Sequence, residues 1–195
     1  MTYYFKGSKI LAPLSITSNE PMYDVDTVSL SKQRASQGAQ RWEVAFNTVT
    51  SGETEADLLV GIITGLATAD TMIMPQLPSV DRVNTASISL GVFAQSTVGD
   101  TTVDVVNDGF ISKGTFIKFS NHAKVYMTIV DQTAGSGPIS FYPPLRAGVP
   151  SGQTMKTGSS VTFNYYRDVN NLRGLTFTDG LISSAGTINL VEALV

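Results

Sequence analysis

The 195-residue sequence contains no cysteine and a single histidine, His122. Without cysteine the chain has no disulfide framework, and no thiolate can act as a nucleophile or a metal ligand. A Ser-His-Asp triad or a multi-histidine metal site would have to use His122. This residue lies in a predicted turn beside Asn121, where local hydrogen bonds are commoner than general-base catalysis, which needs an oriented partner. We therefore expect no enzymatic activity.

Charged residues are also scarce, at 15% of the chain, and the net charge is −3. The 13 lysines and arginines are scattered, with Lys32, Arg34 and Arg41 nearest to forming a group. Sequence-specific nucleic-acid binding is not expected, because it needs clustered cations to displace counterions. No apolar run approaches the ~20 residues that cross a bilayer, and the N-terminal segment lacks the apolar core of a signal peptide. We expect no membrane partner and no cleaved export signal.

The sequence also lacks a motif for a metal or a cofactor. Asp24 and Asp26 are two residues apart, but calcium takes roughly six or more oxygen ligands, and no such set is gathered in the sequence. The glycines between 135 and 152 lack the Gly-x-x-x-x-Gly-Lys-Ser/Thr pattern of a phosphate-binding loop. We therefore predict no catalytic residues, no metal and no cofactor.

The pattern that recurs along the chain is the period-two alternation of β-strands. Within 40–50, Trp42, Val44 and Phe46 fall on one face. Within 114–145, alternating segments are separated by polar breaks at 120–122 and 133–138, which predicts a three-stranded meander. Aromatic side chains bury the largest apolar areas, so we expect these core anchors: Trp42, Phe46, Phe119 and Tyr126.

A helical pattern is confined to residues 52–68. Glu53 and Glu55 lie in its first turn, where the helix dipole favours carboxylates, and apolar residues recur at helical spacing from Leu58 to Leu66. Segments 72–77 and 83–93 are predicted to be strands. With about ten strands and one helix, the chain is predicted to be mainly β.

Two function classes suit such a chain. A carbohydrate-binding β module, which would assist attachment to a host surface, would use exposed aromatic side chains such as those of Trp42 or Tyr126. A subunit of a symmetric assembly would instead have its strand edges and loops covered by neighbouring copies. The residues alone leave both open.

Several motifs follow one another in a defined order. An opening strand with Val28-Ser-Leu30 precedes Gly38-Ala-Gln40-Arg41-Trp42, which runs into an alternating strand, and one amphipathic helix follows near Glu55–Leu66. The series continues with Gly114-x-Phe116-Ile-Lys118-Phe119-x-Asn121-His122-x-Lys124-Val125-Tyr126 and with Tyr142-Pro-Pro-Leu-Arg146. This order resembles that of the distal tail proteins of long-tailed bacteriophages, in particular the smaller members with an inserted oligonucleotide/oligosaccharide-binding (OB) barrel.

The resemblance implies both a domain arrangement and a place in a virion. Residues 1–93 and 167–195 would form a discontinuous β-sandwich with one flanking helix, and residues 94–166 would form an inserted small OB-like β-barrel. The chain would be a structural protein whose homohexameric ring joins the tail tube protein to the tail-tip or baseplate hub proteins. It would be made in the cytoplasm of the host bacterium.

In such a ring, DNA would only pass through the lumen, without being bound. A weakly negative wall would repel phosphate and keep DNA from sticking. We therefore expect some acidic side chains to face that lumen, and the candidates are Asp24, Asp26, Glu43, Glu53 and Glu55.

Overall fold

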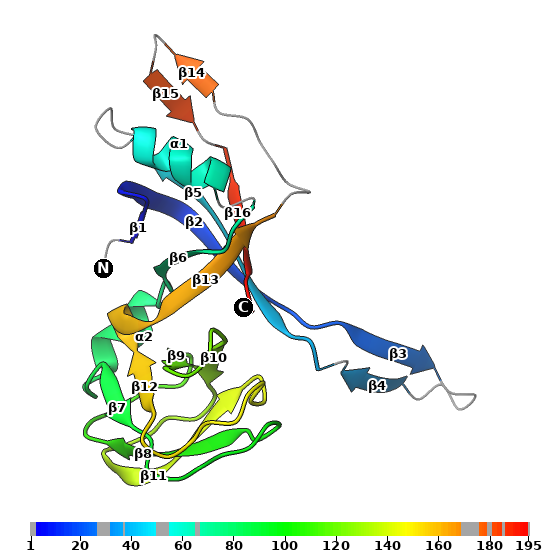
Figure 1. Cartoon of the computed structure of the whole chain (residues 1–195), viewed down its shortest axis with the longest axis vertical. Coiled ribbons are helices and arrows are strands. Elements are labelled where there is room, and N and C mark those ends of the chain that lie inside the picture. The colour runs from blue at the N-terminus through cyan, green and yellow to red at the C-terminus, as the bar shows by residue number, and fades with distance from the viewer. Residues whose placement is uncertain are drawn as a thin grey trace. The chain divides into compact units, whose positions relative to one another are not determined.

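The computed structural model describes residues 3–26, 32–36, 38–49, 55–64, 67–168, 176–178, 181–184 and 186–194. Its regular structure is almost entirely β (Figure 1). One six-stranded sheet is antiparallel, a second six-stranded sheet curls into a half-barrel, and the helices are few and short. This confirms the expected mainly β fold class.

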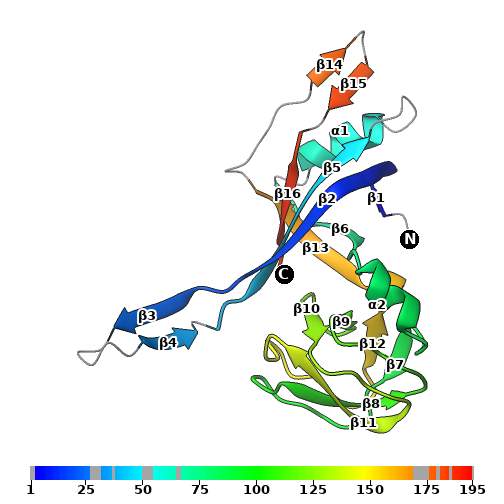
Figure 2. The same cartoon turned by 180° about the vertical axis from the view of Figure 1, so that it is seen from behind.

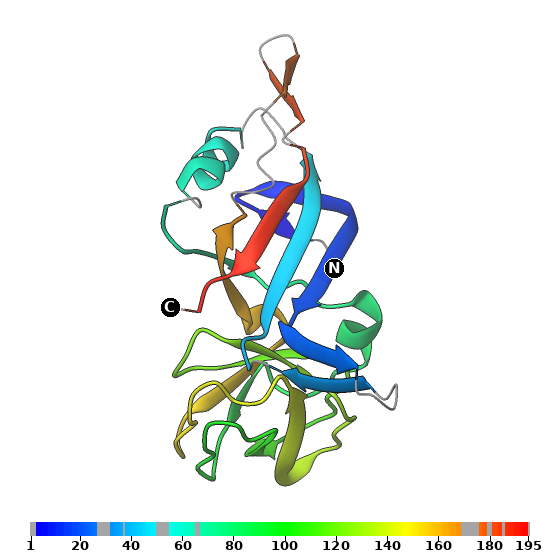
Figure 3. The same ribbon diagram turned by 90° about the vertical axis from the view of Figure 1, so that its right-hand side faces the viewer.

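The first sheet has the strand order β1-β2-β5-β16-β13-β6. Its strands are β1 (Tyr4–Phe5), β2 (Ser8–Asn19), β5 (Arg41–Val49), β16 (Ile188–Glu192), β13 (Thr162–Arg167) and β6 (Asp70–Ile73). Strand β5 pairs with β2 on one side and β16 on the other, and the three strands lie side by side in Figure 3. The predicted alternation in β5 is confirmed, because Trp42, Val44 and Phe46 are buried and the residues between them are partly exposed.

Helix α1 (Glu55–Thr64) confirms the predicted helix over the part of it that the structure describes. Leu58 and Ile62 are buried, as the apolar spacing predicted, but Ala67 and Thr68 lie beyond the helix. The guanidinium of Arg167, itself buried, donates a hydrogen bond to the Ile62 carbonyl oxygen (3.4 Å). Glu53 lies outside the described residues.

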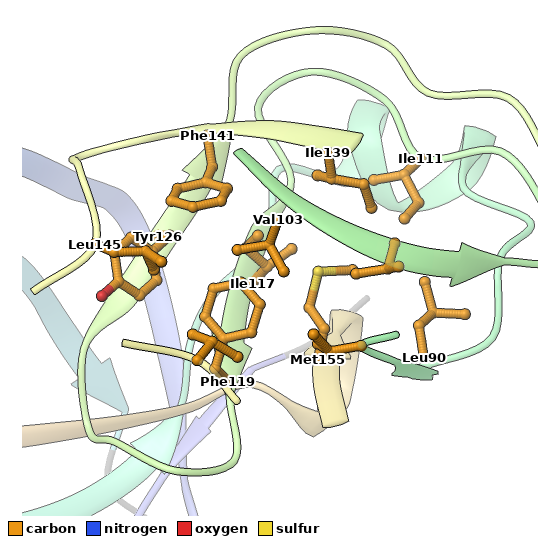
Figure 4. Packing of buried hydrophobic residues seen from close by; sticks show 13 residues of the cluster. Leu90, Val103, Ile111, Ile117, Phe119, Tyr126, Ile139, Phe141, Leu145 and Met155 are labelled. Carbon is orange, nitrogen blue, oxygen red and sulfur yellow. The ribbon is translucent and has the colours of Figure 1, made fainter. Parts of the chain in front are cut away.

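The half-barrel sheet has the strand order β7-β12-β9-β10-β11-β8. Its strands are β7 (Ser89–Gly91), β12 (Thr154–Thr157), β9 (Phe116–Phe119), β10 (Val125–Thr128), β11 (Gly135–Tyr142) and β8 (Thr102–Asn107). Figure 4 shows the apolar side chains of these strands pointing toward one another inside the curl. The rings of Phe119, Tyr126 and Phe141 form its aromatic centre, with centroid separations of 5.2–5.8 Å.

The meander β9-β10-β11 is confirmed by its antiparallel registers, but the predicted break at 133–138 is wrong in part. Strand β11 already begins at Gly135, and its pairing with β8 runs from Gly135 to Ser140 and so includes Pro138. The Phe141 amide donates to the carbonyl oxygen of Thr101, the residue before β8 (3.0 Å). Backbone amides along a strand point alternately to its two sides, so the backbone nitrogen of residue 138 points away from β8. A proline there removes no hydrogen bond of the β8 ladder.

The strand predicted over 83–93 is also wrong for most of its length. Pro78–Val83 forms a short helix, α2, with proline at its start, where a missing amide hydrogen costs nothing. Only Ser89–Gly91 is a strand, β7. The polar side chain of Asn84 bonds to Thr115 Oγ1 (3.0 Å) and to the Ser112 amide (2.8 Å), so this segment pairs with loops and not with a strand. None of the described helices is long and apolar enough to cross a membrane.

The chain divides into two compact units. The half-barrel unit consists of residues 68–165 with Tyr3, Ala193 and Leu194, and the flanking unit consists of residues 4–67 and 166–192. Two small antiparallel pairs complete the flanking unit: β3 (Met22–Asp26) with β4 (Lys32–Ser36), and β14 (Thr176–Thr178) with β15 (Leu181–Ser184). The division into domains 1–93 with 167–195 and 94–166 stays a prediction.

Gly109 lies at a point where two loops of the half-barrel unit pack closely together. A Cβ at Gly109 would lie 2.5–2.6 Å from backbone atoms of Thr85 and Ala86, which cannot move as a side chain can. We predict that Gly109→Ala lowers the free energy of unfolding by about 2–3 kcal/mol, measured by urea denaturation. Gly137→Ala is the matched control, because its Cβ would meet nothing within 4 Å. Equal stability of the two variants would contradict this packing.

Candidate functional site

The β3–β4 hairpin, formed by Met22–Asp26 and Lys32–Ser36, is an exposed part of the flanking unit. In Figures 1 and 2 it continues the ribbon of β2 and β5 away from β16 and α1. Every side chain of β3 is exposed, including Met22 (48%), Tyr23 (64%) and Val25 (61%). The hairpin therefore places three large apolar side chains in solvent.

The register of the hairpin separates its residues into two different faces. Residues directly opposite each other in an antiparallel pair lie on the same face. Tyr23 is opposite Ala35 and Val25 is opposite Gln33, so one face carries no charge. We call these four residues the uncharged face. The other face is ionic, because Asp24 lies opposite Arg34 and Asp26 lies opposite Lys32.

Asp24 anchors the ionic face through two ion pairs. Its Oδ2 lies 3.5 Å from Arg34 Nε and 3.7 Å from Lys32 Nζ. Such exposed pairs stabilise by only about 0–1 kcal/mol, so they contribute little to the stability of the hairpin.

The remaining acidic candidates for the lumen wall lie on other elements. Glu43 of β5 contacts Arg41 Nε (3.3 Å) and accepts a hydrogen bond from the Asn19 amide (2.8 Å). Glu55 is the first residue of α1. The structure thus brings Asp24 and Asp26 together, with two cations, and leaves Glu43 and Glu55 on separate elements. Within the described residues, no group of three or more His, Asp or Glu side chains could hold a metal ion.

The four expected core anchors are all buried. Trp42 is 4% exposed, Phe46 1%, and Phe119 and Tyr126 are fully buried. The ring of Phe46 packs edge-on against the ring of Phe5, with 5.3 Å between the ring centroids. The alternative that Trp42 or Tyr126 stacks on a sugar is wrong for these two residues, because neither ring presents a face to solvent.

His122 is part of a chain of hydrogen bonds in the half-barrel unit. Asn121 Nδ2 donates to the Gly148 carbonyl oxygen (2.8 Å), so Asn121 Oδ1 faces His122 Nδ1 (3.0 Å) as an acceptor. The Tyr126 hydroxyl accepts from the Arg146 amide (3.2 Å) and lies 2.8 Å from His122 Nε2.

These contacts fix the protonation of His122. Because Asn121 Oδ1 can only accept a hydrogen bond, His122 Nδ1 carries the proton and donates it to that oxygen. His122 Nε2 is then unprotonated and accepts from the Tyr126 hydroxyl. Burial, followed by the positive charges of Lys118 and Lys124, lowers the pKa of His122 to about 4. A base with this low pKa, oriented by an amide instead of a carboxylate, is poorly suited to accept a proton near neutrality. The geometry makes His122 a connector between two loops.

Sequence reasoning missed several buried polar side chains, among them Gln76, Lys118 and Glu192. Gln76 bonds both the amide (2.9 Å) and the carbonyl (3.2 Å) of Phe116, which is 40 residues away. Glu192 accepts from the Trp42 amide (3.0 Å) across 150 residues. No local sequence pattern predicts hydrogen bonds between residues so far apart in the chain. Only Lys118 had a signal, since it interrupts an apolar strand.

No protein-family model matches the chain, and no curated protein matches it in sequence.

The depressed pKa of His122 predicts a specific pH dependence of stability. Above pH 6.5, the ordinary pKa of histidine, both folded and unfolded chains are neutral at this residue. As the pH falls from 6.5 toward 4, the unfolded chain binds a proton that the folded chain does not, so stability is lost. We predict that wild type loses about 1–2 kcal/mol more than His122→Gln over this window, allowing for solvent screening of the partly exposed ring.

The measurement is the urea-unfolding free energy of both proteins at a series of pH values. Glutamine is the matched substitution because its amide oxygen can still accept from Tyr126. Parallel pH profiles for the two proteins would contradict the prediction.

Proposed function

We propose that this chain is a structural virion protein of a long-tailed bacteriophage, six copies of which form a ring between the tail tube and the tail tip or baseplate. The ring surrounds the channel through which DNA passes. The order of sequence motifs supports this proposal, as does the mainly β fold. The structural observation that carries it is the uncharged face of the β3–β4 hairpin.

An isolated two-stranded hairpin is at best marginally stable in water. Here the ionic face suits solvent, whereas Tyr23 and Val25 on the uncharged face are more than 60% exposed. Burying such side chains contributes about 1.5–3 kcal/mol each. A partner surface that covers this face would therefore stabilise the hairpin and gain affinity from it.

A second copy of the chain is the partner that the ring requires. In a closed ring each subunit offers one surface to the next and receives the matching surface from the previous one, so a projecting hairpin is used once per contact. The low charge of the chain, 15% of residues, is consistent with a protein whose surface is largely covered in its assembly.

The acidic lumen is part of the same proposal. Neighbouring cations offset the charge of two of its candidates: Lys32 and Arg34 offset Asp24, and Arg41 offsets Glu43. Glu43 and Glu55 remain candidates for the channel wall, where negative charge repels the DNA phosphates. A channel lined by arginines would contradict this part of the proposal.

The double substitution Tyr23→Ser/Val25→Ser tests the assembly. We expect wild type to form rings at high concentration, seen in negative-stain images and as a large species in sedimentation velocity. We expect the variant to remain monomeric, because losing about 3 kcal/mol per contact weakens each contact roughly a hundredfold.

Tyr4→Ser/Val49→Ser is the matched control. It removes the same two side-chain types from exposed positions of the same unit, 59% and 47% exposed. The proposal fails if wild type sediments as a monomer at every concentration, or if the hairpin variant assembles as well as the control.

A further inference from the structure

Two lysines lie directly opposite each other on neighbouring strands of the half-barrel. Lys118 of β9 and Lys156 of β12 are register partners, so their side chains share a face. The flanking pairs, Met155 with Phe119 and Thr157 with Ile117, face the other way, and Met155, Phe119 and Ile117 belong to the apolar core. The lysine pair therefore lies on the outer face of the sheet. Like charges directly opposite each other destabilise a sheet.

Lys118 is held in a fixed position. It is only 8% exposed. Its Nζ donates to Thr162 O (2.9 Å), Thr162 Oγ1 (2.9 Å) and Asn164 Oδ1 (3.1 Å). These three bonds use all three hydrogens of the ammonium group. Its positive charge is thus anchored beside β13.

A pocket of about 290 Å³ opens beside this pair, within the half-barrel unit. Its lining includes neither aspartate nor glutamate, and consists of Lys118, Phe119, Ser120, Asn121, His122, Ala123, Lys156, Thr162 and Asn164. In a chain with more acidic than basic residues, a pocket with two lysines and no carboxylate in its lining is a local concentration of positive charge. Its volume is just below that of the smallest usual ligand pockets, about 300 Å³, so it suits a small group.

Donors are available in this pocket. Within the described part of the chain, the Lys156 ammonium forms no ion pair, and Asn164 Nδ2 has no hydrogen-bond partner. The depressed pKa of His122, caused first by burial and then by Lys118 and Lys124, reflects the same positive potential. An anion in the pocket would offset this potential and the repulsion between the two lysines.

We propose that Lys118, Lys156 and Asn164 form a binding site for a small oxyanion, namely the sulfate, phosphate or carboxylate group of a ligand. Lys156 donates directly to the oxyanion through its ammonium hydrogens. Lys118 supplies a fixed positive charge without donating, since its hydrogens are already used. Asn164 Nδ2 adds a neutral donor. All of these residues belong to the half-barrel unit, whereas the proposed ring contact is made by the β3–β4 hairpin of the flanking unit. The oxyanion site is therefore independent of ring formation.

The single histidine makes the site measurable. His122 lines the pocket, and its imidazole signals in an NMR spectrum of the whole chain can come from no other residue. We expect sodium sulfate, added at constant ionic strength against sodium chloride, to shift these signals saturably and to raise the pKa of His122. Glucose 6-phosphate should do the same, and glucose should not.

Two variants separate a built site from general attraction. Lys156→Gln should weaken sulfate binding at least tenfold while leaving the protein at least as resistant to urea, because it removes a like-charge contact. Lys113→Gln removes the same charge from an exposed position of the same unit and should change the affinity less than twofold.

Three results would overturn the proposal: the absence of a saturable response to sulfate, equal weakening by both variants, or binding of glucose as tight as that of its phosphate. Each can be observed whether or not the chain forms rings, so this inference and the ring proposal can fail separately.

Discussion

Both units of this protein depend on strands that bury one of their two faces. In the half-barrel unit, Phe119, Tyr126 and Phe141 meet inside the curl, where each is at most 1% exposed. In the flanking unit, Trp42 and Phe46 are buried on one face of β5. The β3–β4 hairpin is an exception, because in the part of the chain that the structure describes its side chains are exposed, Tyr23 by 64% and Val25 by 61%. This exposed apolar area is a source of binding free energy for the proposed assembly, because burying it removes apolar surface from water.

The polar groups of the half-barrel unit follow a different constraint, which is that buried donors and acceptors need partners. Gln76 satisfies both backbone groups of Phe116, and His122 links the Asn121 loop to the Arg146 loop through Tyr126. These contacts stabilise loops that have little regular structure. Lys118 satisfies its hydrogen bonds yet lies opposite a second positive charge. A like-charge pair of this kind destabilises a sheet, which is why we assign it to a ligand.

The sequence predicted those features that depend on local pattern. Period-two alternation was enough to predict β5 and the meander, and helical spacing was enough to predict the apolar stripe of α1 near Leu58. Sequence pattern failed where a distant partner decides the structure. Asn84 bonds to Ser112 and Thr115 in a loop and is not part of a strand. Pro138 lies within strand β11 because its backbone nitrogen points away from β8. The lysine pair could not be predicted either, because the alternation does not reveal that Lys156 is opposite Lys118. Register is a property of the folded sheet.

The central claim is that another copy of the chain covers the uncharged face of the β3–β4 hairpin. Hydrogen–deuterium exchange of the backbone amides in Met22–Asp26 and Lys32–Ser36, followed across a dilution series, tests it most directly. The account predicts slow exchange at high concentration and fast exchange on dilution, while the amides of β9 and β10 stay protected throughout. Hairpin amides that exchange equally fast at every concentration would contradict it.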